Sequence, residues 1–505
     1  MIRKHVLFLL TSGLLSACTV GPSFTVPVAK APDSWFDIQR VQNPPDDMRI
    51  PHAMAPSVAL INSGPDPRWW TLFDDAELNS LIERAVAGNL DLQTAVIRIT
   101  EAREQVVVSR AAGLPNVSAN ASYMREQLGV KGLLKSEGVY QRTDSLGANG
   151  TTIRNAIDVA SEPTNVFQDG FDASWELDLF GRVRRSVESS NAQAQEQVES
   201  KNDSLVSLEA EVAQTYSQMR GAQLLKRVTL GEIDSEQKIL DLTREQARVG
   251  LTSMSDVQSA SAQVGSLEAQ LPQYDAQVAQ AMNSLSVLTG NPPGTLDAEL
   301  QAPGAVPPVP PTVPIGLPST LARRRPDIRQ AEAQLHAATA EVGVSVAQMY
   351  PDISLTGSVG TRATRANYLA HWSSLFWSWG PSISLPIFEG GRLRANVKIS
   401  KAQAAEAGLQ YRSTVLKALQ DVDNALVSYR TDQDRREALE RTVEANRESV
   451  RLATESYEKG LVTFITVLNA ERDLASTRQQ LAQTTVSVTT DLIALYKALG
   501  GGWED

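Results

Sequence analysis

The sequence predicts a mainly α-helical protein with a membrane β-barrel, in which a unit of long coiled-coil hairpins and β-strands occurs twice. Three observations predict this fold class. Motifs recur at a constant spacing, long proline-free stretches follow a heptad pattern, and stretches of alternating polarity lie between the motifs. No run of about 18 apolar residues follows Cys18, so we expect no transmembrane helix.

The repeat is marked by pairs of glycines in similar short motifs, such as "GRVR" and "GRLR". The members of each pair lie 210 positions apart: Gly181 and Gly391, Gly250 and Gly460, Gly290 and Gly500. Upstream, Asp91 and Pro115 correspond to Asp327 and Pro351 at a spacing of 236. The interval between the proline and the first glycine is therefore 26 residues longer in the first half. Constant spacing indicates packed structure, and the variable interval indicates a loop, which we place from about Met124 to Val166.

The constant interval predicts helical hairpins over 182–290 and 392–499. No proline occurs from Arg182 to Val249 or from Arg392 to Lys459. A seam with spacings of three and four runs through each stretch, which is typical of coiled-coil packing. The seam positions are Leu225, Val228, Glu232, Ser235, Ile239, Leu242, Gln246 and Val249, and then Leu439, Val443, Asn446, Val450, Ala453 and Tyr457. A solid stalk and helices that line water both fit this pattern, and Pro272 should interrupt the first return helix.

The variable interval predicts four strands, at about 116–124, 167–180, 352–361 and 374–388. Apolar and polar residues alternate along them, as in "SLFWSWGPSISLPIF", where tryptophans share a face opposite serines. Strands of this length with one apolar face fit an outer-membrane barrel, although a half-exposed soluble sheet has the same pattern. Four strands cannot close a barrel, since the smallest have about eight. Two chains would supply eight strands and three would supply twelve.

The N-terminus has the layout of an export signal. Arg3 and Lys4 precede an apolar run that is too short to span a bilayer, and small residues precede Cys18, the only cysteine of the 505 residues. The stretch "LLSAC" resembles the lipobox of bacterial lipoproteins. That resemblance implies cleavage after residue 17 and acyl chains on Cys18. An ordinary secretory signal that happens to contain a cysteine is the alternative.

Composition argues against catalysis and against nucleic-acid binding. The formal net charge of −11 is a poor balance for binding nucleic acid. Four histidines and one cysteine provide no metal-binding constellation, and we find no HExxH, P-loop or G-x-S-x-G motif. We therefore expect neither enzymatic activity nor a cofactor other than covalent lipid.

Five further stretches, in order along the chain, resemble the TolC-like outer-membrane factors, of the NodT-type lipoprotein branch. They are "CTVGPSFTVP" from Cys18, "WWTLFDDAELNSLI" from Trp69, "LPSTLARRRPDIRQAE" from Leu317, "SLPIFEGGRLR" from Ser384 and "LYKALGGGW" from Leu495. The family implies a homotrimer with a twelve-stranded barrel in the outer membrane and a periplasmic α-barrel. It implies the exit duct of a tripartite efflux system, with a periplasmic adaptor and an inner-membrane RND-type transporter as partners.

With this family, the chain divides into six parts. They are a signal peptide (1–17), an extended N-terminal segment (18–74), a first repeat (75–290), a Pro-rich equatorial linker (291–322), a second repeat (323–500) and a C-terminal tail (501–505). A role in type I protein secretion and a trimeric coiled-coil adhesin are the alternative functions. The sequence does not identify the exported substrate.

The resemblance also implies which residues act. The hairpin tips that would contact the adaptor are Gly250, Leu251, Thr252, Ser253, Gly460, Leu461, Val462 and Thr463. The periplasmic gate would comprise Asp256, Tyr457, Ile465, Thr466, Asn469 and Arg472. Asp256 and Tyr457 match positions where an acid on one hairpin meets a tyrosine on the other. Asn469 replaces the aspartate of a Leu-Asp-Ala-x-Arg pattern, so we expect weak attraction of cations there, unless Glu471 or Asp473 faces the lumen.

Overall fold

The computed structural model describes residues 19–28, 32, 34–36, 58–60, 64, 66–127 and 129–503. Cys18 and the predicted signal peptide lie outside these residues. The chain forms two compact units, and each is assembled from three separate stretches. The first unit contains Met1–Phe24, Glu104–Asn191 and Ala337–Ala404, and the second contains Thr25–Arg103, Ala192–His336 and Ala405–Asp505.

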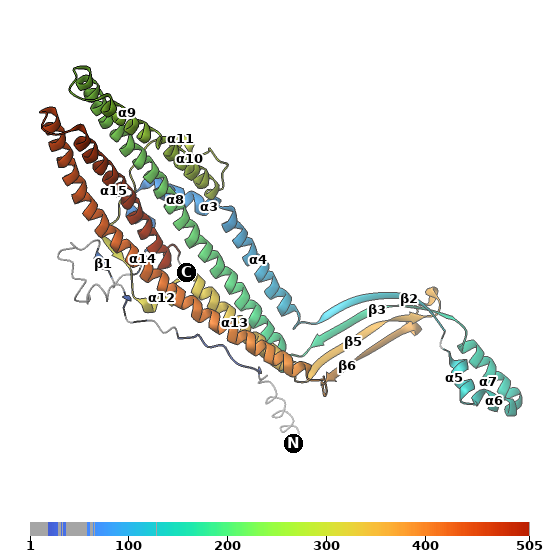
Figure 1. Cartoon of the computed structure of the whole chain (residues 1–505). Helices are drawn as coiled ribbons and strands as arrows, with labels where there is room; N and C mark the ends of the chain where they lie inside the picture. The colour runs from blue at the N-terminus through green and yellow to red at the C-terminus, as the bar shows by residue number, and fades with distance from the viewer. Residues whose placement is uncertain are drawn as a thin grey trace. The chain divides into compact units, whose positions relative to one another are not determined.

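The first unit contains a four-stranded antiparallel sheet, shown in Figure 1. Its strands are β2 (Asn116–Glu126), β3 (Thr164–Glu176), β5 (Asp352–Ala363) and β6 (Leu375–Ser384), in the order β2-β3-β5-β6. Each strand pair thus comes from one half of the duplicated sequence. Within the described residues, β2 and β6 each have a strand neighbour on one side only, so both edges of the sheet are open.

The register of the sheet separates an apolar face from a polar face. Phe171 pairs with Val359, which pairs with Trp377, and these three side chains are 58%, 45% and 68% exposed. The adjacent row, which lies on the opposite face, pairs Ser358 with Ser378, whose hydroxyls lie 2.8 Å apart. The alternation predicted from the sequence is therefore confirmed, since large apolar side chains gather on one exposed face.

Two strands are shorter than their predicted ranges. β3 ends at Glu176 and β6 ends at Ser384, where the sequence predicted 180 and 388. The cause is the start of β5 at Asp352, because this residue pairs with Ser384 and leaves residues 385–388 no neighbouring strand on that side. Apolar residues continue the alternation past that point, so the pattern alone gives no end.

The segment between β2 and β3 is helical, which corrects the predicted loop. It contains α5 (Val130–Ser136), α6 (Val139–Arg142), the 3₁₀-helix η4 (Thr143–Leu146) and α7 (Gly147–Ala160), grouped beyond the ends of the two strands (Figure 1). Ser161 fastens this group, because its buried hydroxyl accepts a hydrogen bond from the Lys131 amide at 2.9 Å. Glycines at the starts of helices and at close contacts interrupt the helical pattern of this segment, so the sequence alone did not predict these helices.

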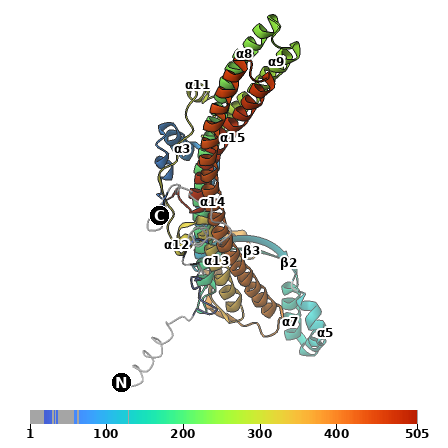
Figure 2. The same cartoon turned by 60° about the vertical axis from the view of Figure 1, so that its left-hand side comes forward.

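The helices show the internal duplication directly. α4 (Leu90–Ala111) and α13 (Pro326–Ala347) both have 22 residues, and α8 (Arg182–Arg248) and α14 (Arg392–Glu458) both have 67. Each long helix is followed by a return, which is α15 (Phe464–Ala498) in the second half. Figures 1 and 2 show α8 beside its return helix α9 (Met254–Glu268) and α14 beside α15.

Pro272 divides the first return, as predicted. α9 ends at Glu268 and α10 (Leu271–Leu288) begins three residues later, with Pro272 in its first turn. Proline has no amide proton and its ring clashes with the carbonyl four residues earlier, here that of Glu268. The second return has no proline at the corresponding position, and α15 is continuous over 35 residues.

The main core of the second unit lies between the long helices and several shorter elements. α3 (Ala76–Gly88) and the 3₁₀-helix η3 (Trp69–Phe73) contribute fully buried side chains, and Trp69 stacks on Tyr496 of α15 with ring centroids 5.3 Å apart. The Pro-rich segment contains α11 (Asp297–Leu300), β4 (Thr312–Pro314) and the start of α12 (Pro318–Arg324). β4 pairs in parallel with β1 (Val58–Leu60), and the sequence predicted neither strand.

The predicted heptad seam fits α14 better than α8. In α14, buried residues follow one another three or four positions apart: Tyr411, Val415, Ala418, Val422, Leu426, Tyr429 and Gln433. Val443 and Tyr457 continue the seam and are also buried. In α8, the predicted positions Glu232 and Ile239 are buried, but Val249 is 58% exposed, and Thr229, Glu236 and Thr243 are buried instead. The buried face of α8 thus includes polar residues and differs from the seam that the sequence predicted.

Candidate functional site

The two hairpin tips are turns of the same design. Gly250 and Gly460 have φ angles of 76° and 72°, a left-handed conformation that favours glycine. The following amides bond back into the helix, from Leu251 to Gln246 O at 2.8 Å and from Leu461 to Ser456 O at 2.9 Å. This six-to-one bond is the signature of a Schellman motif, which terminates a helix.

The leucines after these glycines are exposed. Leu251 is 77% exposed and Leu461 is 74% exposed. In a Schellman motif this residue commonly packs against the last turn of the helix, but here both side chains extend into solvent. An added Cβ at Gly250 or Gly460 would meet no atom within 4 Å, so each glycine is needed for its backbone conformation and not for space.

The first tip has a capping box that the second lacks. The Ser253 hydroxyl accepts from the Asp256 amide at 3.2 Å, and the Asp256 carboxylate accepts from the Ser253 amide at 3.2 Å and from the Thr252 hydroxyl at 2.7 Å. These hydrogen bonds hold the pKa of Asp256 below its usual range. At the corresponding positions of the second tip, Thr463 makes no side-chain cap bond to α15, and Thr466 replaces the aspartate. The second tip is therefore fastened less tightly.

Tyr457 belongs to a buried cluster at the tip end of the helices. Its ring packs on Phe464 with centroids 5.7 Å apart, and the cluster also contains Ile239, Val257 and Leu468. The side chain is 8% exposed, and its hydroxyl has no hydrogen-bond partner among the described residues. Within this single chain, Asp256 is bonded to its own turn, so the link between Asp256 and Tyr457 that the resemblance implied stays a prediction.

The remaining predicted gate residues lie on the opposite, exposed side of α15. Ile465, Thr466, Asn469 and Arg472 are exposed, whereas Phe464, Val467 and Leu468 are buried. The spacing of four and three between 465, 469 and 472 places these residues on one helix face. Arg472 donates to Gln263 Oε1 of α9 at 3.3 Å. The chain therefore presents a polar stripe with one apolar member next to the second tip.

Within the first unit, the first residues that the structure describes, from residue 19 onwards, are held by a set of specific contacts. The Val20 amide donates to Phe180 O at 3.2 Å, and the buried Arg185 donates to Val20 O and to Ser23 Oγ, each at 3.4 Å. Close backbone approaches complete the site. An added Cβ at Gly21 would lie 2.6 Å from Gly343 Cα, and one at Gly181 would lie 2.5 Å from Thr19 Cγ2. Residue 19 is thus held beside the residues that follow β3, and no motif in the sequence predicts this site.

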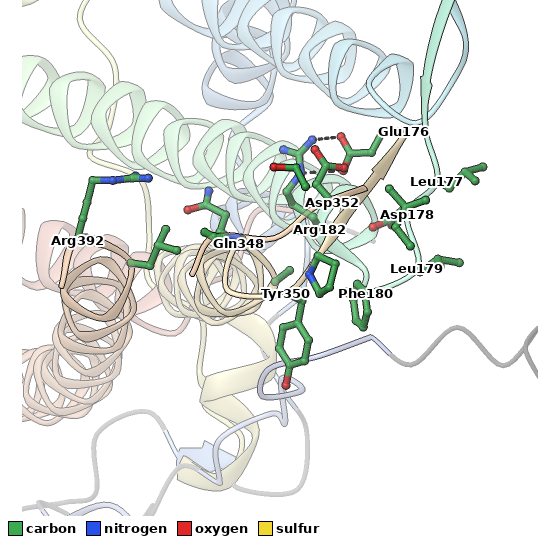
Figure 3. A pocket seen from close by; sticks show the side chains of 16 residues that line it. Glu176, Leu177, Asp178, Leu179, Phe180, Arg182, Gln348, Tyr350, Asp352 and Arg392 are labelled. Atoms are coloured by element: carbon green, nitrogen blue, oxygen red, sulfur yellow. Dashed lines mark hydrogen bonds and ion pairs between the residues drawn. The ribbon is translucent and has the colours of Figure 1, made fainter. Parts of the chain in front are cut away.

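A cavity of about 350 Å³ lies in the first unit, beside the residues that follow β3 (Figure 3). Its wall contains the ion pair of Arg182 with Glu176. The hydrogen bond from Arg182 to Glu176 raises the pKa of Arg182, and the negative charge of Asp352 contributes in the same direction to a lesser extent. Phe180 stacks on Tyr350 with ring centroids 4.9 Å apart. Three acidic residues (Glu176, Asp178 and Asp352) and two basic residues (Arg182 and Arg392) line the cavity, so its acidic groups outnumber its basic groups by one.

No helix in the described ranges is long and apolar enough to cross a membrane. No group of three or more histidine, cysteine, aspartate or glutamate side chains in those ranges is arranged to hold a metal ion.

An open-edged sheet with one apolar face, together with duplicated long hairpins that end in exposed turns, defines a subunit of a TolC-like outer-membrane channel. Solved structures show the same fold. The outer-membrane channel OprN superposes with a TM-score of 0.82 at 32% identity, covering 96% of this chain and 100% of that one. The open state of the Neisseria gonorrhoeae MtrE channel superposes with a TM-score of 0.73 at 27% identity, covering 96% and 98%.

The family described as "Outer membrane efflux protein" matches residues 81–291 and 317–501, and the chain belongs to this family. Nodulation protein T of Rhizobium leguminosarum bv. viciae is 31% identical over 490 residues, which are 97% of this chain and 92% of that protein. The toluene efflux pump outer membrane protein TtgC of Pseudomonas putida is 31% identical over 510 residues, covering 100% and 96%. The protein is an outer-membrane efflux channel that extends into the periplasm.

Proposed function

We propose that three copies of this chain form a passive exit duct for small molecules, in a tripartite pump with a periplasmic adaptor and an inner-membrane RND-type transporter. One observation carries the proposal: the sheet has an apolar face, a polar face and two open edges. The open edges of β2 and β6 must be paired before the sheet can enter a bilayer, because unpaired backbone groups there are costly. Pairing between neighbouring chains meets this requirement, and three chains give twelve strands.

The adaptor would bind at the hairpin tips. Leu251 and Leu461 offer two exposed apolar side chains on turns whose shape is fixed by glycine. Exposed apolar residues on a rigid turn lose little conformational freedom on binding, which favours a docking role. Passive conduction involves no catalytic step, and we assign none to the chain.

The gate would involve α15 and its neighbours. The exposed stripe of Ile465, Thr466, Asn469 and Arg472 lies next to the less firmly capped tip, where movement costs least. A bond from the buried Tyr457 hydroxyl to a carboxylate such as Asp256 would be charge-assisted and could form between chains in the closed duct.

Lipid on Cys18 would anchor the duct in the outer membrane. The site formed by Arg185, Gly21 and Gly343 fixes the residue next to Cys18 beside the end of β3. Acyl chains attached there would start close to the strands that we place in the bilayer. Each buried CH₂ would contribute about 0.8 kcal/mol to anchoring.

Two measurements test the proposed function. Purified full-length protein in mild detergent should have the mass of a trimer by light scattering, and it should conduct ions in a planar bilayer. A cell that lacks the chain should accumulate a fluorescent efflux substrate and lose it again when the gene is restored. A monodisperse monomer, or a restored gene without restored export, would contradict the proposal.

A further inference from the structure

Two glutamates of α8 are buried in the helical part of the second unit. Glu232 and Glu236 are each 3% exposed, and they lie one turn apart on the face that also buries Thr229 and Ile239. One carboxylate oxygen of each, Glu232 Oε1 and Glu236 Oε2, has no hydrogen-bond partner among the described residues. Burial of an ionised, unpartnered carboxylate is costly, so these side chains are stable there mainly in the neutral form.

The groups that face these glutamates come from α15 and from the return helices of the first half. Gln479 of α15 donates to Glu232 Oε2 at 3.5 Å and to Gln270 Oε1 at 3.2 Å. The charged groups of α15 near the pair are Glu471, Arg472 and Arg478. Among the other charges on this part of α8, the exposed Asp234 and Lys238 pair with each other at 2.7 Å, and the exposed Asp241 pairs with Arg244 at 3.0 Å.

Burial raises the pKa of Glu232 and the pKa of Glu236 to about 7 in each case. These values already include the negative charge of Glu471, which raises both pKa values, and the positive charges of Arg478, which lowers that of Glu232, and Arg472, which lowers that of Glu236. Burial also raises the pKa of Glu471 itself. Two carboxyls on one seam thus change charge near neutral pH, whereas exposed carboxyls of the same helix would be ionised.

We propose that Glu232 and Glu236 form a proton-operated latch, which holds α8 against α15 when both are neutral and loosens this contact when they ionise. The inference rests on the proposed function, because it assigns the latch to opening of the duct. Separation of α15 from α8 would hydrate both carboxylates and remove the cost of ionising them. The latch lies at the contact between the first hairpin and the second. This contact must change if the second hairpin moves alone.

The direction of the effect follows from proton linkage. The packed state binds protons more tightly than a separated state whose carboxyls are hydrated. Acid therefore favours the packed state. The free-energy advantage of the packed state over the separated state is complete below the ordinary glutamate pKa of 4.5, and it is lost as the pH rises through about 7. Between pH of about 6 and about 8, each carboxyl can shift the packing equilibrium by up to about tenfold.

Hydrogen exchange on the full-length protein in detergent tests the latch without requiring conduction. The amides of residues 229–243 in α8 and 467–479 in α15 should lose about tenfold to a hundredfold protection between pH of about 6 and about 8, after correction for intrinsic exchange, because the two carboxyls act together. The double variant Glu232→Gln/Glu236→Gln should keep the acid level of protection throughout, because glutamine has the shape of the neutral acid. The matched control Asp241→Asn/Glu245→Gln removes two exposed acids of the same helix and should behave as wild type.

Constant protection in the wild type, or an unchanged pH response in the double glutamine variant, would overturn the latch. If that variant does not fold, Glu471→Gln provides the second test. Removal of this nearby negative charge should move the midpoint of the pH-dependent change in protection to lower pH than in the wild type. An unmoved midpoint counts against the latch. Planar-bilayer recordings then separate the two proposals. The latch predicts lower open probability in acid for wild type only, whereas exchange that follows the prediction without any conductance would refute the duct and not the latch.

Discussion

Ser253 and Asp256 hold each other across the first turn of α9. The Ser253 hydroxyl accepts from the Asp256 amide, and the Asp256 carboxylate accepts from the Ser253 amide, each at 3.2 Å. The corresponding residues of the second tip, Thr463 and Thr466, make no such pair. The two tips thus share the same turn, but only the first tip has the capping box.

We predict that Ser253→Ala loosens the first tip by about 1 kcal/mol, since removal of a capping side chain costs roughly that amount. Thr463→Ala should change the second tip much less, because no cap bond is lost there. The Asp256 contribution should disappear as the pH falls through its depressed pKa, because the bonds stabilise the ionised form. Local hydrogen exchange at residues 250–258 and 460–468 measures both tips in one experiment.

The exposed leucines give a prediction about export. Leu251→Asp and Leu461→Asp should reduce export strongly, because a charge on an apolar contact must be desolvated on binding. The mass of the assembly and its membrane insertion should stay unchanged, since both side chains are in solvent. Glu245→Gln on the same hairpin is the control. Wild-type export in the double leucine variant would contradict adaptor binding at the tips.

Glu209 predicts a pH dependence of stability. This side chain is 2% exposed, and burial raises its pKa to about 9. The folded state therefore keeps a proton that the unfolded state releases above about 4.5, and stability falls as the pH rises from there to about 9. Glu209→Gln should stabilise the protein by about 1 to 3 kcal/mol near neutral pH and very little in acid.

Thermal unfolding from pH of about 5 to about 8 measures this difference. Glu211→Gln, an exposed neighbour on α8, serves as the control and should show no such trend. Equal melting temperatures of wild type and Glu209→Gln at every pH would contradict a buried neutral carboxyl. Gly502→Ala should be destabilising in all conditions, because an added Cβ would lie 2.0 Å from Glu209 Oε2 and the glycine has a φ of 112°.

The anchor prediction separates lipidation from positioning. Cys18→Ser should abolish metabolic labelling with a fatty acid. Gly343→Val should retain labelling but release residues 19–24 from their site, because its side chain would occupy the space of Arg185, 2.8 Å from the glycine Cβ position. Limited proteolysis near residue 24 reports the release. Labelling that persists in Cys18→Ser would exclude this lipidation site.

The gate prediction concerns Asn469. This residue is exposed on the polar stripe of α15, and it is neutral where the family pattern has an acid. Asn469→Asp in three chains would place three carboxylates close together and attract divalent cations. We expect increased block by divalent cations added on the periplasmic side in planar-bilayer recordings. Strong block of the wild-type channel, unchanged by the substitution, would refute the assignment.

Much of the fold could be predicted because duplication and periodicity both leave traces in the sequence. Glycines 210 positions apart located both tips, and alternation at Trp377 and Ser378 assigned the faces of β6. The ends of β3 and β6 could not be predicted, because the start of β5 determines them. β1 and β4 were missed, since three-residue strands have no period to detect.

The site was predicted unevenly for similar physical reasons. Exposure of Leu251 and Leu461 agrees with a contact role, because turn residues are identified by local sequence. Burial of Glu232 and Glu236 could not be foreseen from composition, since glutamate on a helix is usually solvated. The site around Arg185 joins residues more than 150 positions apart, and no local pattern connects them.

The most direct test of the account is disulfide trapping between the open edges of β2 and β6 in intact cells. Asn120→Cys in β2 would be combined in turn with Ser378→Cys and Ser382→Cys in β6, all on the polar face of the sheet. Each single variant, with Cys18 retained, controls for other pairings. If chains close one barrel, oxidation at the matching register should give covalent dimers and trimers and nothing larger. Monomers at every register, or a ladder that continues beyond three chains, would contradict a closed trimeric duct.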